Sequence, residues 1–153
     1  MVINGHGGNT APNWAVTTQV GEENIFPITF SYWQAVRGEM AAWAEADGAS
    51  VGHGGEWETS LQLYLRPHLI DRSRMVADEF PNPYSPNLQL FAQYAERRRD
   101  TARATGVMGN PLVASAAKGE RLFNAIVGKL VQLVTEMHHA PVRQYKEFGS
   151  HCP

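Results

Sequence analysis

Two short segments of strand-like composition, separated by a helical stretch, most restrict the folds open to this chain. Met1, Val2 and Ile3 are apolar and run directly into a glycine-rich turn, as the last residues of a buried strand do. Residues 28–33 are rich in β-branched and aromatic side chains, which predicts a second buried strand with Pro27 at its entry. Strands that alternate with helices predict an α/β fold, in which ligands bind in loops after the carboxyl ends of the strands.

Helical patterns account for much of the remaining chain. The clearest is the last, in which apolar residues recur every three to four positions: Leu122, Phe123, Ile126, Val127, Leu130, Val131, Val134 and Met137. We expect further helices in four regions: one capped by Asn9 or Thr10, one over 34–46, one over 56–65 and one from Ser85 to about Gly106. The polar, proline-punctuated stretch 66–85 is long for a loop, which indicates a role at a site or an interface.

Composition excludes several classes of function. With 153 residues, 43% of them hydrophobic and 18% charged, the chain has the size and make-up of one globular domain. A formal net charge of -2 gives no electrostatic basis for binding nucleic acid or an anionic membrane. The sequence has no apolar run of the roughly 20 residues that a membrane helix needs and no basic start typical of a secretory signal. One cysteine, Cys152, cannot form an internal disulfide, so we expect a cytoplasmic protein.

Two turns place a histidine beside glycines, and they hold the candidate site residues. The first is residues 4–9 (NGHGGN) and the second is residues 53–60 (HGGEWETS). Glycines leave space around an imidazole and let backbone amides approach an ion or an oxyanion, and neutral imidazole commonly binds zinc, manganese or iron. A solvent-exposed turn histidine explains either turn alone equally well, and Glu56 and Glu58 also suit the first turn of a helix. The hypothesis of a site therefore depends on the two turns together.

The two turns, in this order, resemble the creatininase (creatinine amidohydrolase) family. Residues 106–111 and the segment 117–120 (AKGE) are similar to the family's closing segments, so the resemblance runs from Val2 to about Met137. It implies a three-layer α/β/α sandwich with a mainly parallel sheet. It also implies a metal-dependent amidohydrolase that cleaves a non-peptide C–N bond in a small cyclic amide or formamide-like substrate. The implied cofactor is a divalent metal, zinc first and manganese or iron as alternatives, and the implied assembly is a homo-oligomer, commonly a hexamer.

The resemblance also assigns roles within the two turns. His6 matches a metal-ligand histidine, and His53 matches the catalytic histidine that handles the proton of the amide. Glu58 matches a site carboxylate, either catalytic or metal-binding. The residues expected to line the substrate site are Asn4, Gly5, Gly7 and Trp57. For Trp57, packing in the core is an equal alternative.

The sequence departs from the family pattern in two places. Creatininases carry a second metal-binding carboxylate two residues after the first histidine, where this chain has Gly8. That weakens the case for creatinine as substrate and makes Glu56 or Glu58 the candidate replacement. The family's Glu-x-His pair and following aspartate lie in an N-terminal segment that we expect this single domain, residues 1–153, to lack. Residues 136–138 (EMH) have the same letters in the wrong context.

A second hypothesis follows from the missing ligands. The chain would then be a truncated, non-catalytic family member that serves as an oligomerisation or binding module, or one whose metal site needs a partner chain. A parallel sheet without its first strands exposes an apolar edge, so we expect the isolated chain to aggregate or to form a compensating oligomer.

Overall fold

Two three-residue strands pair in parallel in the computed structural model, which describes residues 1–21, 27–47, 52–78 and 105–140. Strand β1 (Val2–Asn4) and strand β2 (Thr29–Ser31) align Val2 with Thr29 and Asn4 with Ser31. Parallel neighbours need a crossover connection, and its described part holds the 3-10 turn η1 (Gly7–Asn9) and helix α1 (Thr10–Gly21). The parallel pairing confirms the predicted α/β class. The helix expected between Ser85 and Gly106 lies largely outside the described residues.

The second strand is shorter than predicted because a helix starts at its end. Helix α2 (Tyr32–Ala35) has Ser31 as its N-cap, and the Ser31 N–H donates to Gln34 Oε1 at 3.0 Å. This contact is half of a capping box, which fixes the chain at a helix start rather than in a strand. The helix predicted over 34–46 is divided at Val36, whose φ of -122° is not helical, and it continues as α3 (Arg37–Trp43).

The last two long helices follow their patterns closely. Helix α4 (Glu56–Leu65) has the predicted bounds, and α6 (Ala116–His139) contains the whole apolar repeat. Ser115 caps α6 by accepting the Lys118 N–H at 3.2 Å. Short 3-10 turns follow α4 and precede α6: η2 (Pro67–Leu69), η3 (Arg72–Arg74) and η4 (Pro111–Val113). No helix in the described ranges is both long enough and apolar enough to span a membrane.

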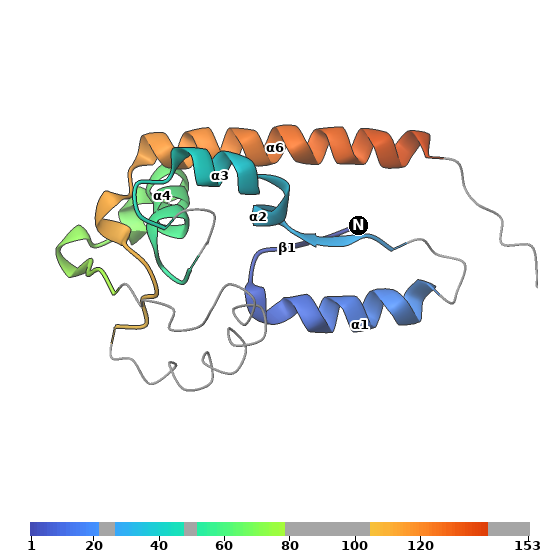
Figure 1. Cartoon of the computed structure of the whole chain (residues 1–153), viewed down its shortest axis with the longest axis horizontal. Helices are drawn as coiled ribbons and strands as arrows, with labels where there is room; N and C mark the ends of the chain where they lie inside the picture. The colour runs from blue at the N-terminus through green and yellow to red at the C-terminus, as the bar shows by residue number, and fades with distance from the viewer. Residues whose placement is uncertain (22–26, 48–51, 79–104, 141–153) are drawn as a thin grey trace, which may run out of the picture.

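The core lies where α3, α4 and α6 meet. Its fully buried members are Val36, Met40, Trp57 and Leu122, with Ile126 at the margin. Figure 1 shows α6 covering α3 and α4 with its first half and extending beyond them with its second half. The sheet lies between α6 and α1 in that view, with helices on both sides of it. From its midpoint onward, α6 leaves Val127, Val131 and Val134 at least 40% exposed.

Strand β1 presents apolar side chains to solvent. Met1, Val2 and Ile3 are 45–48% exposed, and among the described residues β2 is the only strand that pairs with β1. Exposed apolar residues on an unpaired strand edge favour association with another chain. The aggregation or oligomerisation expected from the sequence stays a prediction.

The close contact between helices α4 and α6 depends on Gly119. A Cβ added at Gly119 would overlap the Ser60 carbonyl oxygen and lie 2.8 Å from Tyr64 Cβ, so α4 and α6 could not keep their spacing. We predict that Gly119→Ala lowers the free energy of unfolding by about 1–3 kcal/mol, the usual cost of overpacking. Urea denaturation followed by circular dichroism measures it.

Gly128 is a matched control on the same helix, because nothing lies within 4 Å of the position its Cβ would take. Gly128→Ala should raise the free energy of unfolding by about 0.5–1 kcal/mol through helix propensity alone. Equal effects of the two substitutions would contradict the proposed close contact.

Candidate active site

The turn that carries His6 is built on the side chain of Asn4 at the end of β1. Asn4 is 4% exposed, and its Oδ1 accepts the His6 N–H at 3.0 Å. Its Nδ2 donates to Ser31 Oγ at 2.9 Å and to Thr10 Oγ1 at 3.3 Å. The amide thus ties the ends of both strands to the start of α1. Asn4 holds the His6 turn in place, and its expected contact with a substrate stays a prediction.

The glycines of the first turn leave the His6 imidazole open. His6 is exposed, and nothing lies within 4 Å of where a Cβ of Gly5 would be. A Cβ at Gly8 would lie 3.0 Å from His6 Nε2. Position 8 is therefore directly beside the imidazole, and a carboxylate there would lie next to the ring. Gly7 begins η1, and the substrate-lining role expected of Gly5 and Gly7 remains a prediction.

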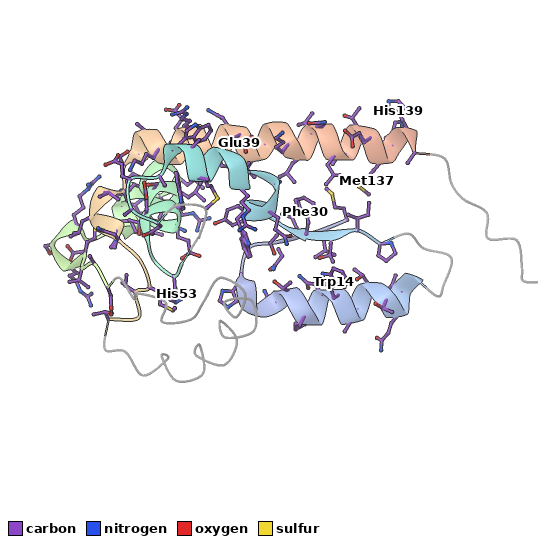
Figure 2. The ribbon with its side chains drawn as sticks, in the orientation of Figure 1. Trp14, Phe30, Glu39, His53, Met137 and His139 are labelled. Atoms are coloured by element: carbon purple, nitrogen blue, oxygen red, sulfur yellow. The ribbon has the colours of Figure 1, made fainter. Side chains whose placement is uncertain are left out.

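The turn that carries His53 is shaped by left-handed glycines and by a two-residue bridge. Gly52 and Gly54 have φ of 57° and 62°, a conformation that favours glycine. The His53 N–H donates to the Met108 carbonyl at 2.9 Å, and the Met108 N–H donates back to the His53 carbonyl at 2.7 Å. His53 is thereby attached to the turn at 106–110. Figure 2 shows its side chain on the side of the molecule turned away from α6.

The fold brings the two predicted histidines together. Their ring centroids are 6.4 Å apart and the ring planes make an angle of 65°. Within the described part of the chain, neither imidazole has a hydrogen-bonding partner. A zinc ion lies about 2 Å from a ligating nitrogen, so two rings that share one ion tetrahedrally have centroids about 5 Å apart. The observed spacing is wider, and it suits two groups with separate roles.

Glu58 lies beside the His53 turn. Its Oε2 accepts the Gly54 N–H at 2.6 Å, and the side chain is half-buried. Burial, and then the nearby Glu58 charge, raise the pKa of the Tyr32 hydroxyl well above its ordinary value of 10.0. Glu58 therefore has Tyr32 as a neighbour, a residue for which the sequence pattern predicts only a place in a strand. The sequence signal that points to Tyr32 as a site residue is its position directly after the carboxyl end of a parallel strand.

Glu56 has a structural role that its neighbour Glu58 lacks. The Glu56 side chain is 0% exposed, and its carboxylate accepts the N–H groups of Glu45, Ala46 and Asp47 at 2.9–3.2 Å. Lys118 Nζ donates to Glu56 Oε1 at 2.6 Å. A carboxylate with this many internal donors has little capacity left for an ion. Of the two glutamates considered as replacements for a carboxylate at Gly8, Glu58 is therefore the one that remains.

Trp57 is a core residue in this structure. Its side chain is 0% exposed and packs in the cluster formed with Val36, Met40 and Leu122. A side chain without exposed surface is not placed to line a substrate site. This burial favours the alternative, core packing, and the expected contact of Trp57 with a substrate stays a prediction.

The described residues supply only part of the ligand set that a divalent metal needs. His6 presents an open imidazole, which is a good ligand. No group of three or more histidine, cysteine, aspartate or glutamate side chains gathers at one point among the residues that the structure describes. Catalytic zinc sites typically have three protein ligands. These residues could thus supply one or two ligands, and the others would have to come from elsewhere.

A comparison with protein families assigns the chain to a family. The model of the family described as creatinine amidohydrolase matches residues 1–134, a span that includes both histidine turns and most of α6. The chain belongs to the creatininase family. This confirms the resemblance inferred from the motifs.

Known members of the creatininase family differ in what they act on. A mycofactocin precursor peptide peptidase from Mycobacterium ulcerans is 26% identical over 143 residues, which cover 92% of this chain and 50% of that protein. Creatinine amidohydrolase from Pseudomonas putida is 30% identical over 122 residues, covering 76% of this chain and 44% of that protein. The chain therefore spans about half the length of the curated relatives it matches.

Solved creatininase structures share the fold. A crystal structure of creatinine amidohydrolase superimposes with a TM-score of 0.62 at 23% identity, over 91% of this chain and 56% of that one. Other matching creatininase structures include a Zn-Zn type, a manganese form and a complex with creatine. At these identities the comparison establishes the α/β fold of this chain.

The pair formed by Glu56 and Lys118 gives a prediction about pH. Burial by itself would raise the pKa of Glu56, but the hydrogen bonds from Lys118 and from three backbone N–H groups outweigh it and hold the pKa below its ordinary value of 4.5. A carboxyl group of this kind stabilises the fold above its ordinary pKa, and the stabilisation is lost as pH falls through the lowered value. Glu56→Gln should therefore be less stable than the parent at pH 7, with the difference shrinking below about pH 4.5. Urea unfolding across this pH range measures it.

Replacing the cationic partner, Lys118, tests the same ion pair. Lys118→Met leaves the buried Glu56 charge unpaired, and we expect a loss of about 3–5 kcal/mol at pH 7. Lys129 is the matched control, because its Nζ lies 4.0 Å from Glu39 and its side chain is 47% exposed. Lys129→Met should change the free energy of unfolding by less than about 1 kcal/mol. Comparable losses at both lysines would contradict the importance of the buried pair.

Proposed function

We propose that this chain contributes the two-histidine part of a metal-dependent amidohydrolase site. The main support for this proposal is that the His6 and His53 imidazoles lie close together, with ring centroids 6.4 Å apart. Glu58 is hydrogen-bonded to the His53 turn. Two open imidazoles and a carboxylate are the groups that hydrolysis of an amide needs for ion binding and proton transfer. The membership of the creatininase family supports the same class of reaction.

In this proposal His53 is the catalytic acid and base. Hydrolysis of an amide adds water to the carbonyl carbon and breaks the C–N bond, and the departing nitrogen must gain a proton. His53 suits this transfer because its ring is exposed and has no hydrogen-bonding partner among the described residues. Its backbone is fixed by the bridge to Met108, so the ring starts from a defined position.

His6 and Glu58 take the role of metal ligands, with Glu58 able to orient the substrate instead. A divalent ion bound there would polarise the carbonyl and lower the pKa of water. His6 suits this role because its Nε2 is open on the side of Gly8. We favour zinc, with manganese as the alternative, because matching creatininases are known in both forms. The remaining ligands would come from a segment or a chain beyond the described residues.

The substrate is proposed to be a small molecule with a cyclic or formamide-like C–N bond. The relatives act on chemically different compounds, as their names state, so likeness alone does not choose among them. Gly8 leaves space beside His6 where a carboxylate would otherwise lie. A site without that negative charge argues against creatinine and for a different amide.

A second candidate function rests on the incomplete ligand set. With fewer than three ligands gathered among the described residues and with Met1, Val2 and Ile3 exposed on β1, the chain could act as an oligomerisation or binding module. It could equally complete its site with a partner chain. Bound metal and oligomeric state distinguish these possibilities.

The decisive measurement is metal content per chain on purified, tag-free protein, with size-exclusion chromatography alongside. We expect near-stoichiometric zinc or manganese in the parent after addition of the ion, and a large loss in His6→Ala. His53→Ala should keep the metal but lose about 10²–10⁴-fold in kcat/KM on a formamide or cyclic amide probe. His139→Ala, at the exposed end of α6, should change neither quantity.

Two results would overturn the enzyme proposal. One is a parent protein that binds no metal after zinc or manganese is added, which would favour the non-catalytic function. The other is a His53→Ala variant with unchanged turnover in an active preparation. An oligomer that binds metal only when assembled would instead support a site shared between chains.

A further inference from the structure

The side chain of Asp47 joins two backbone segments that the sequence keeps far apart. Asp47 Oδ2 accepts the Glu56 N–H at 2.6 Å, at the first residue of α4. Asp47 Oδ1 accepts the Asn110 N–H at 2.9 Å, in the turn that follows Gly109. One carboxylate therefore binds the beginning of α4 and the turn at 106–110 at the same time. The His53 turn lies between these two attachments.

Glu56 holds Asp47 in return. Glu56 Oε2 accepts the Asp47 N–H at 3.0 Å, while Asp47 Oδ2 accepts the Glu56 N–H. This reciprocal exchange resembles a capping box, formed here between residues nine apart in the chain. It fixes the backbone of Asp47, so the carboxylate reaches Asn110 from a defined position.

Two glycines make room for the Asp47 carboxylate. A Cβ at Gly55 would overlap Asp47 Oδ2, and a Cβ at Gly109 would lie 2.6 Å from the same oxygen. Gly109 also has a φ of 144°, which side-chain-bearing residues rarely adopt. The second glycine after His53 and the glycine before Asn110 are thus explained by one side chain, which the sequence motifs did not include.

We propose that Asp47 is the positioning residue of the candidate site: its carboxylate locks the His53 turn against the turn at 106–110. The role rests on the proposed function, since the position of His53 matters only if His53 reacts. A carboxylate suits the position, because both of its oxygens accept N–H groups. Asparagine has a single acceptor oxygen and would point its NH₂ group at the other N–H.

The two backbone hydrogen bonds between His53 and Met108 should show whether Asp47 holds the two turns together. Both bonds, at 2.9 Å and 2.7 Å, join the His53 turn to the turn at 106–110, which Asp47 ties to the start of α4 directly after the His53 turn. When Asp47 no longer holds the turns together, these bonds should open more often, and the distance between the two imidazoles should become variable. The core around Leu122 and Ile126 is an apolar cluster built on α3, α4 and α6, so it should be unaffected.

The test is amide hydrogen exchange by NMR on the full 153-residue chain, with Asp47→Asn compared with the parent. We expect exchange at the His53 and Met108 amides to be at least about tenfold faster, with Leu122 and Ile126 unchanged, because the opening is local. The nuclear Overhauser contact between the His6 and His53 rings should weaken. Asp71→Asn is the matched control, since Asp71 caps the exposed turn η3 by accepting the Ser73 N–H.

Gly109→Ala gives a second, independent disturbance of the same contact and keeps every carboxylate. It should produce the same local pattern at His53 and Met108 if Asp47→Asn does not fold. Unchanged exchange in both variants would overturn the proposal, and so would equal acceleration throughout the core, which would show a role in global stability alone. A parent chain without metal or turnover, combined with the local pattern, would refute the proposed function and leave the lock in place.

Discussion

The buried carboxylate of Glu56 is the contact on which the rest of the structure depends. A charge in a protein interior is tolerated only when several donors replace the water it has lost. Glu56 obtains them from the backbone of residues 45–47 and from Lys118. Lys118 in turn donates to the Val113 carbonyl and pairs with Glu45. One carboxylate therefore fixes the end of α3, the start of α4 and the start of α6 relative to one another.

The candidate site is formed by two turns, of which the His53 turn depends on this arrangement. The His53 turn precedes α4 directly, so the bonds that hold Glu56 also hold the adjacent residues. The His6 turn depends instead on Asn4, whose side chain joins the ends of the two parallel strands. Two separate sets of hydrogen bonds thus bring the imidazoles within 6.4 Å of each other. Ligand-binding groups at the carboxyl ends of parallel strands are usual in α/β folds, because loops from neighbouring strands meet there.

The structure also relates the two candidate functions. The chain belongs to the creatininase family but spans about half the length of its curated relatives. The described residues hold both histidines of the motif, yet they gather fewer than three ligands at one point. A catalytic site shared with another segment and a binding role for exposed β1 are both compatible with these facts. Each requires contact with further polypeptide, and the apolar edge of β1 that no described strand covers is a suitable place for it.

The sequence by itself determined the α/β class, the bounds of α4, the apolar repeat of α6 and the two histidine turns. These features depend on local periodicity, on glycine and proline, and on short motifs, which are readable without knowledge of the packing. It did not determine which side each residue of the second motif faces. Residues two apart on a helix point about 200° from one another, so Glu56 and Glu58 cannot both face the core, and only the packing of α6 shows that Glu56 does. The same packing buries Trp57. The hydrogen bond between Asp47 and Asn110 joins residues 63 positions apart, and over that separation the spacing of residues in the sequence does not predict a contact.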